Sequence, residues 1–242
     1  LYIMVSVIVI VVIAMIGGYI NAISPRTTRL DLAVHKKAGE LKKLHMVMVS
    51  DIHMGTVIGP RRIAAMVKRI NGLKPDIIII AGDAVDEDLA PVFRHNLGAS
   101  LEDLKAPFGV YCITGNHEYI GGAEAAVTYL GKHRINLLRD SHTLINNSFY
   151  LVGREDRDRE RFTGKKRRSV AELLQGIDKT RPVILLDHQP FQLDNAEKAG
   201  VDIQLSGHTH HGQMWPANYI TKAIYELSYG YLKKGNTHFY VS

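Results

Sequence analysis

Short polar motifs follow several apolar runs, and this arrangement restricts how the chain can fold more than any other feature. The apolar runs at 46–50, 76–81 and 183–186 are each followed by Asp or His side chains. Runs of about four to eight apolar residues bounded by polar ones are typical of buried strands. Because the carboxyl ends of parallel strands meet at one sheet edge, we expect these polar side chains to gather there.

Five such motifs occur in order along the chain: Asp51-Ile52-His53, Gly82-Asp83, Gly115-Asn116-His117-Glu118, Asp187-His188 and Gly207-His208-Thr209-His210. Residues two apart on an extended segment point the same way, so the two Asp/His-x-His pairs can each reach a single ion. Oxygen and imidazole ligands together suit Mn²⁺, Fe, Zn²⁺ or Co²⁺ better than Ca²⁺. The motifs therefore predict a centre of two metal ions about 3.5–4 Å apart that supplies hydroxide for attack on phosphorus.

With these motifs the chain resembles the calcineurin-like metallophosphoesterase family. It is most similar to the membrane-associated bacterial branch, which carries the Gly-His-Thr-His-x-Gly-Gln signature found here at 207–213. The resemblance extends from about Met46 to Ser242. It implies an α/β fold, a four-layer α/β/β/α sandwich with the metals at one edge of the two sheets.

The resemblance also implies a role for each motif residue. One set would hold the first metal, namely Asp51, His53 and His210. A second set would hold the second metal, namely Asn116, His188 and His208, with Asp83 bridging the two ions. His117 matches the family histidine that contacts the phosphate and assists the leaving group, and Glu118 would orient it. A carboxylate partner would favour the imidazolium form of His117.

The chain departs from the family pattern at two positions and adds one candidate. Glu118 stands where many relatives have Asp, so we expect the same role with a changed geometry. His211 replaces a frequent glycine and is expected to line the substrate pocket, with a third imidazole near the metals as the alternative. Arg154 is a second candidate for contacting the substrate.

The first 24 residues are almost wholly apolar and predict a transmembrane helix, since about 23 residues at 1.5 Å each match the hydrocarbon core. A cleaved signal peptide and a buried core helix are the alternatives. Residues 25–44 form a basic linker, whose positive charge favours a cytosol-facing domain at residues 45–242. The chain begins with Leu, and the family strand at Tyr240–Ser242 normally continues, so we expect a part of a longer protein.

Strands are expected at 46–50, 76–81, 109–114, 143–145, 149–152, 183–186 and 201–205, with antiparallel strands within 225–241. Helices are expected at 60–70, 99–105, 123–132 and 169–176.

The single cysteine, Cys112, excludes an internal disulfide and fits a reducing compartment. The formal net charge of +6 favours anionic partners such as phosphate esters or acidic lipids.

The segment 154–168 is rich in both basic and acidic residues. We expect a solvated, mobile loop there, and contact with lipid phosphate or a substrate head group is the alternative. Nucleic-acid binding is not expected, because no stacking aromatic apart from Phe162 lies among the charges. No obligate protein partner is indicated.

The sequence thus predicts a membrane-anchored phosphoesterase that hydrolyses phosphodiester or pyrophosphate-linked, and in particular lipid-linked, substrates with two metals. Two other functions stay open: a phosphomonoesterase or protein phosphatase, and a metal-binding regulatory module without turnover. Protein phosphatases of this kind usually carry extra arginines beside the metal motifs, and Met54-Gly55 offers none.

Overall fold

The computed structural model describes all residues 1–242 and divides into two compact units, Leu1–Ala33 and Val34–Ser242. The first unit contains one helix, α1 (Tyr2–Ile23), which is long and apolar enough to cross a membrane. Its length and composition identify this helix as a candidate membrane span, and a signal sequence would meet the same criterion. The predicted division at residues 24 and 44 stays a prediction.

The second unit contains two β-sheets. The four-stranded sheet is wholly parallel, in the order β1 (Met46–Val49), β2 (Ile77–Ile80), β3 (Val110–Cys112) and β4 (Asn136–Leu137). The six-stranded sheet has the order β5 (Ser141–Ile145), β6 (Phe149–Gly153), β7 (Val183–Leu186), β8 (Ile203–Ser206), β10 (Thr237–Val241) and β9 (Gly230–Lys234). Its inner strands are parallel and its two edge strands pair antiparallel.

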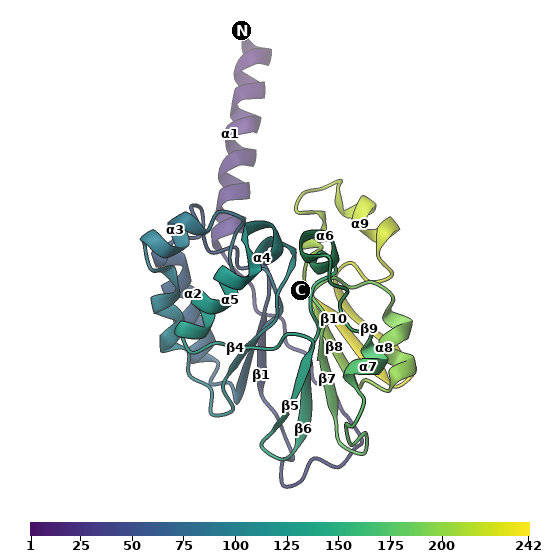
Figure 1. Cartoon of the computed structure of the whole chain (residues 1–242). Helices are drawn as coiled ribbons and strands as arrows, with labels where there is room; N and C mark the ends of the chain where they lie inside the picture. Colours follow the sequence, from purple (N-terminus) through teal and green to yellow (C-terminus); the bar gives the residue numbers. More distant parts are fainter. The chain divides into compact units, whose positions relative to one another are not determined.

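Helices cover the outer faces of both sheets (Figure 1). The four-stranded sheet carries α2 (Pro60–Gly72), α3 (Leu89–Arg94), η1 (Leu97–Asp103), α4 (Asn116–Gly121) and α5 (Ala123–Lys132). The six-stranded sheet is followed or interrupted by α6 (Arg159–Thr163), α7 (Val170–Leu173), α8 (Leu193–Ala199), η2 (His210–Gly212) and α9 (Asn218–Ile224).

Strand β2 shows why the domain has four layers. Ile77 and Ile79 point into the core between the sheets, where they meet Phe149 and Leu186. The alternate residues of β2 pack outward against α2 and α5. A third apolar cluster joins the six-stranded sheet to α7 and α8. The predicted α/β/β/α sandwich is therefore confirmed, with fully buried isoleucines on both faces of one central strand.

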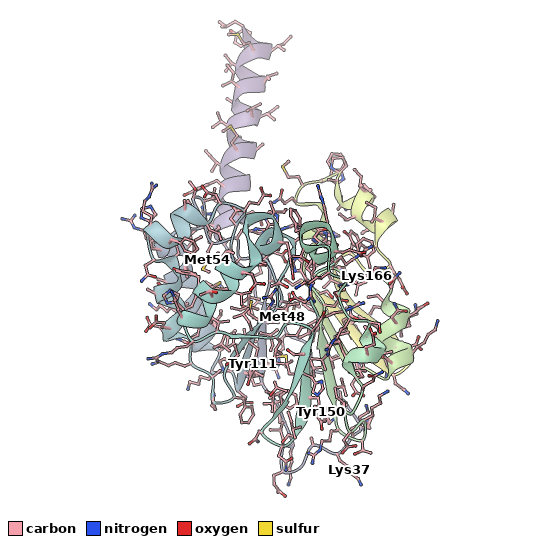
Figure 2. All side chains as sticks on the ribbon, viewed as in Figure 1. Lys37, Met48, Met54, Tyr111, Tyr150 and Lys166 are labelled. Carbon is pink, nitrogen blue, oxygen red and sulfur yellow. The ribbon has the colours of Figure 1, made fainter.

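Labelled side chains mark two of these layers (Figure 2). Met48 and Tyr111 lie against the cluster between the sheets, whereas Met54 is fully buried in the cluster under the helices of the four-stranded sheet. Both clusters extend to the ends of the strands. This packing holds in place the first residues of the loops that follow the strands.

Most predicted elements are present, with shifts at their ends, and two differ in kind or length. The expected helix at 99–105 is a 3₁₀ helix that begins at Leu97. The helix expected at 169–176 is confined to Val170–Leu173, where Ser169 and Glu172 form a capping box. Five short helices (α3, α4, α6, α8, α9) and β4 were not predicted, because elements of seven residues or fewer are too short to show a period.

We expect Ile79→Ala to lower the free energy of unfolding by about 2–5 kcal/mol, because it leaves a cavity between the two sheets. Leu144→Ala, at a partly exposed site on β5, should change it by no more than about 0.5 kcal/mol. Urea unfolding of the full chain in detergent, followed by circular dichroism, measures both. Equal losses would show that the inter-sheet core does not dominate stability.

Candidate metal centre

The loops that leave β1, β2, β3, β7 and β8 carry all five motifs. Several motif residues have left-handed backbone conformations, with φ of 53° at Asp51, 50° at His53, 50° at Asp83, 73° at His208 and 46° at His210. Such values are uncommon for residues other than glycine and cluster at functional sites. The Asp51 and His53 amides donate to the carbonyls of Gly82 and Asp83, at 3.1 and 3.0 Å. These bonds join the loop after β1 to the loop after β2.

Three motif glycines leave room for neighbouring polar side chains. A Cβ on Gly82 would collide with the imidazole of His188. A Cβ on Gly115 would collide with the carboxylate of Asp83, and one on Gly207 with that of Asp51. The sequence places glycine where the backbone of one loop touches a polar side chain of another.

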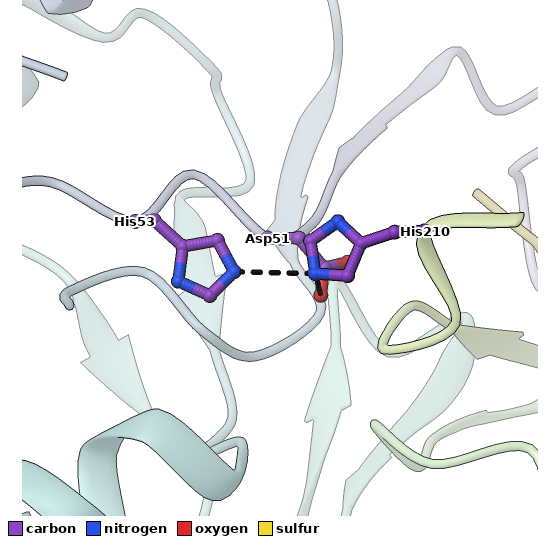
Figure 3. A group of neighbouring side chains, drawn as sticks. All are labelled: Asp51, His53 and His210. Carbon is purple, nitrogen blue, oxygen red and sulfur yellow. Dashed lines mark hydrogen bonds and ion pairs between the residues drawn. The ribbon is translucent and has the colours of Figure 1, made fainter. Parts of the chain in front are cut away.

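A first cluster contains Asp51, His53 and His210, whose ligand atoms lie within 4.8 Å of one another (Figure 3). Nε2 of His53 lies 3.4 Å from Nε2 of His210, and the latter lies 3.6 Å from Oδ1 of Asp51. The Asp51 carboxylate also accepts hydrogen bonds from the His208 amide at 3.0 and 3.1 Å. The cluster thus joins the loop after β1 of one sheet to the loop after β8 of the other.

A second cluster contains Asp83, His188 and His208, again within 4.8 Å. Asn116 belongs beside it, because its Oδ1 lies 2.8 Å from Nδ1 of His208. The two clusters adjoin, since Oδ2 of Asp83 is 3.9 Å from Nε2 of His53. All seven predicted ligand residues therefore lie in one continuous group, while their individual assignment to two metals stays a prediction.

The buried imidazole of His188 fits a cation. Its Nδ1 lies 2.7 Å from the Ala81 carbonyl, to which it donates. Its Nε2 therefore faces the carboxylates, 3.0 Å from Asp83 and 3.9 Å from Asp51, but makes no well-aligned hydrogen bond. An imidazole nitrogen held this way, with a carbonyl fixing the other nitrogen, is the usual arrangement of a metal-binding histidine.

The same residues carry strongly shifted pKa values. Burial alone would lower the pKa of His188, but the charge of Asp83 outweighs burial and raises it well above its ordinary value. Burial would raise the pKa of Asp83, but His188 holds it well below its usual range. Burial, and then the charge of His188, lowers the pKa of His208 to about 4. Burial also lowers the pKa of His53. The metal-free site thus keeps its proton on His188.

His117 forms a third group of possible ligands with His53 and Asp83, and its ring lies near a carboxylate, Asp86, that sequence reasoning missed. Its amide donates to Oδ1 of Asp83 at 2.9 Å. Its Nδ1 lies 3.3 Å from Asp86 and 3.6 Å from Glu87. Asp86 follows Asp83 by three residues, and this Gly-Asp-x-x-Asp spacing is the signal that could have found it.

Glu118 lies elsewhere than expected. Its buried carboxylate accepts hydrogen bonds from the amides of Asp83 and Val85, each at 3.0 Å, and of Gly115 at 2.7 Å. Burial, and then the charge of Asp83, raises the pKa of Glu118 to about 7. Glu118 therefore contacts these three backbone amides in place of the expected His117. In this way it holds the loops after β2 and β3 together.

The two predicted substrate-binding residues lie apart from the clusters. His211 lies outside all three groups of possible ligands, and its ring centroid is 5.1 Å from that of Tyr229. Arg154 is buried and donates to Asp187 at 2.9 Å and to the Arg168 carbonyl at 2.9 Å. This geometry indicates that Arg154 stabilises the charge of Asp187, the residue before His188.

The segment 154–168, expected to be a solvated, mobile loop, has two parts: residues 154–156 are buried, whereas most of 157–168 is exposed and includes helix α6. Glu155 and Asp156 are buried, and Glu155 accepts hydrogen bonds at 2.6 Å each from Thr114, Tyr119 and Arg139. Burial, more than any neighbouring charge, raises the pKa of Asp156 to about 6. The expectation of a solvated segment is therefore wrong for residues 154–156, whose charges pair with neighbouring polar side chains, whereas residues 160–166 are exposed as expected.

Comparison with known proteins agrees with this geometry. A family model described as calcineurin-like phosphoesterase matches residues 44–212. A bovine (Bos taurus) transmembrane protein with metallophosphoesterase domain is 31% identical over 98% of this chain and 56% of its own length. An uncharacterized metallophosphoesterase of Aquifex aeolicus is 34% identical over 82% of this chain and 78% of its own. The chain thus spans little more than half of the bovine relative.

The solved structure of the Thermus thermophilus protein TT1561 shares the fold, with a TM-score of 0.53 and 14% identity. The match covers 82% of this chain and 89% of the TT1561 chain. The fold, the family match and the groups of candidate ligands all agree with a metallophosphoesterase domain. The chain belongs to the calcineurin-like phosphoesterase family.

We expect Gly82→Ala to weaken metal binding by about 10–100-fold, because its methyl group would displace the His188 ring. Gly131→Ala, in α5, is the matched control, since nothing lies near its Cβ. Equilibrium dialysis with Mn²⁺ measures both affinities. Unchanged affinity in Gly82→Ala would contradict the tight packing of this loop against His188.

Metal binding should release about one proton near pH 7, because a protonated His188 must lose its proton to bind a cation. The raised pKa of His188 also sets the sign of the pH dependence: metal affinity should rise as pH rises through neutrality. Calorimetric titration in buffers of different ionisation enthalpy measures the release. A metal affinity that does not change between about pH 6 and 8, with no proton released, would contradict a protonated His188.

Proposed function

We propose that this protein is a membrane-anchored phosphoesterase with two metal ions that acts on phosphodiester or pyrophosphate-linked substrates, with lipid-linked esters as the favoured class. The single observation that supports the dinuclear site is the continuity of the ligand-rich group, in which two separate triads adjoin through Asp83 and His53. The two triads arise from loops of both sheets, so folding itself brings them together.

In this proposal the first ion is held by Asp51, His53 and His210. The second ion is held by Asn116, His188 and His208, and Asp83 serves both ions. When bound, two such ions supply Lewis-acid polarisation of a phosphoryl oxygen and lower the pKa of water toward about 7. Mn²⁺, Fe and Zn²⁺ suit this donor set, and Mn²⁺ is the first ion to test.

His117 would act on the substrate rather than on a metal. Its Nδ1 lies 3.3 Å from Asp86 and 3.6 Å from Glu87, and these carboxylates would orient the ring. Its Nε2 would then donate to a phosphoryl oxygen or protonate the leaving oxygen. Asp86 takes the orienting role that was expected of Glu118.

The membrane context supports a lipid-linked substrate. Helix α1 is long and apolar enough to serve as an anchor, and a relative is named as a transmembrane protein. Basic residues at 26–43 favour a cytosolic location of the domain. An anchored enzyme meets membrane-bound substrates at a high effective concentration.

Purified full-length protein with added Mn²⁺ should hydrolyse bis(p-nitrophenyl) phosphate faster than p-nitrophenyl phosphate, and chelation should abolish both activities. His117→Ala should lower kcat by about 10²–10⁴-fold while metal content stays unchanged. Asp83→Asn should lose both metal and activity. Release of p-nitrophenolate and metal analysis of each variant provide the measurements.

His142→Ala serves as the matched histidine control, because its ring contacts only the sheet and the Leu173 carbonyl, away from the site. Wild-type rates in both His117→Ala and Asp83→Asn would refute the assigned roles. A preference for the monoester or for a phosphopeptide would refute the diesterase assignment while leaving the metal centre intact.

A further inference from the structure

A large apolar surface follows the last metal-site motif. Trp215 is 80% exposed and Met214 75% exposed, although both are large apolar side chains. Helix α9 contains no buried residue at all. We call this surface the α9 patch, and its members are Met214, Trp215, Tyr219, Ile220 and Ile224.

Much of the apolar surface of the α9 patch stays outside the packing of the domain. Exposed apolar side chains that gather in one place mark a contact with another molecule or a membrane. Its two aromatic residues, Trp215 and Tyr219, are of the kind enriched where a membrane meets water.

Positive charge lies at the same end of the domain as the patch (Figure 1). The exposed residues of α6 and the loop after it include Arg161, Lys165 and Lys166, together with an exposed Phe162. This segment and α9 lie at the same end of the domain (Figure 1). Arg157, two residues before α6, places its guanidinium 4.0 Å from the centroid of the Phe191 ring, and that ring lies 4.6 Å from Tyr225, the residue after α9.

The patch also adjoins the metal centre. Helix α9 packs against η2, which contains His210. At the other end of the helix, the ring centroid of Tyr225 is 6.1 Å from that of His208. Whatever covers the patch therefore lies directly beside the residues proposed to bind metal.

We propose that the α9 patch docks onto the surface of an anionic lipid bilayer, with Arg161, Lys165 and Lys166 facing the head groups. The inference rests on α1 being the membrane span proposed above. Apolar side chains enter the interface while nearby Lys and Arg residues are attracted by acidic lipids. The segment Ser24–Ala33 reaches at most about 35 Å, so a domain on this tether stays near the bilayer.

A second copy of the chain fits the patch less well than a bilayer does. A two-fold contact through the patch would bring the cationic segment of each copy toward the other and oppose association. Docking instead presents the metal centre to the head-group layer, where a lipid-linked phosphoester would reach it without leaving the membrane.

The single tryptophan of the chain reports on this docking, because Trp215 lies in the patch. The full chain is reconstituted into bilayers of equal parts phosphatidylcholine and phosphatidylglycerol, with a fraction of the lipids brominated on the acyl chain. Trp215 emission should shift to shorter wavelength relative to detergent and be quenched by the brominated lipid. Quenching should be weaker in pure phosphatidylcholine.

The double variant Ile220→Glu/Ile224→Glu should lose most of the quenching, whereas Leu144→Glu, on the edge strand β5, should keep it. Circular dichroism verifies that each variant is folded. Flotation of the vesicles tests the α1 anchor separately, since all variants should float if α1 spans the bilayer. Floating protein without quenching would overturn the docking alone.

Two further outcomes would also overturn the proposal. Equal quenching in neutral and anionic bilayers would remove the role of the cationic segment. A shift that appears only at high protein-to-lipid ratio, without quenching by brominated lipid, would assign the patch to a second copy of the chain.

Discussion

The contact between Asp83 and His188 is the constraint on which the rest of the site depends. Asp83 follows β2 of one sheet and His188 follows β7 of the other, and their side chains lie 3.0 Å apart with almost no access to water. A buried pair of opposite charges is costly to desolvate and is weak evidence for stability by itself. In the proposed metal centre this cost would be offset, because a cation held by His188 and Asp83 would take the place of the proton on His188.

The core between the sheets makes that contact possible. Isoleucines of β2 interlock with Phe149 and Leu186 of the facing sheet and fix the separation of the strand ends. Short loops are then sufficient to bring the motif residues together. Glycines at 82, 115 and 207 allow the backbone of one loop to approach a candidate ligand side chain of another. Left-handed backbone conformations at the motif residues turn their side chains toward the shared space. Stability and site geometry are therefore carried by the same packing.

Much of this arrangement follows from the sequence, and the exceptions have physical causes. Four consecutive isoleucines are typical of a strand buried on both faces, and polar motifs that follow such strands meet at one edge. Asp86 was not identified from the sequence, because its contact with His117 depends on the path of a turn and not on a periodic pattern of residues. Glu118 was given the wrong partner because the backbone amides that surround it cannot be seen in sequence. The exposure of α9 depends equally on tertiary packing, which residue types do not reveal.

Crystals of the full-length protein soaked in Mn²⁺ would test the central claim most directly through anomalous scattering from the metal. Two peaks are expected, one among Asp51, His53 and His210 and one among Asn116, His188 and His208, with Asp83 between them. A single peak, or peaks away from these side chains, would contradict a dinuclear centre.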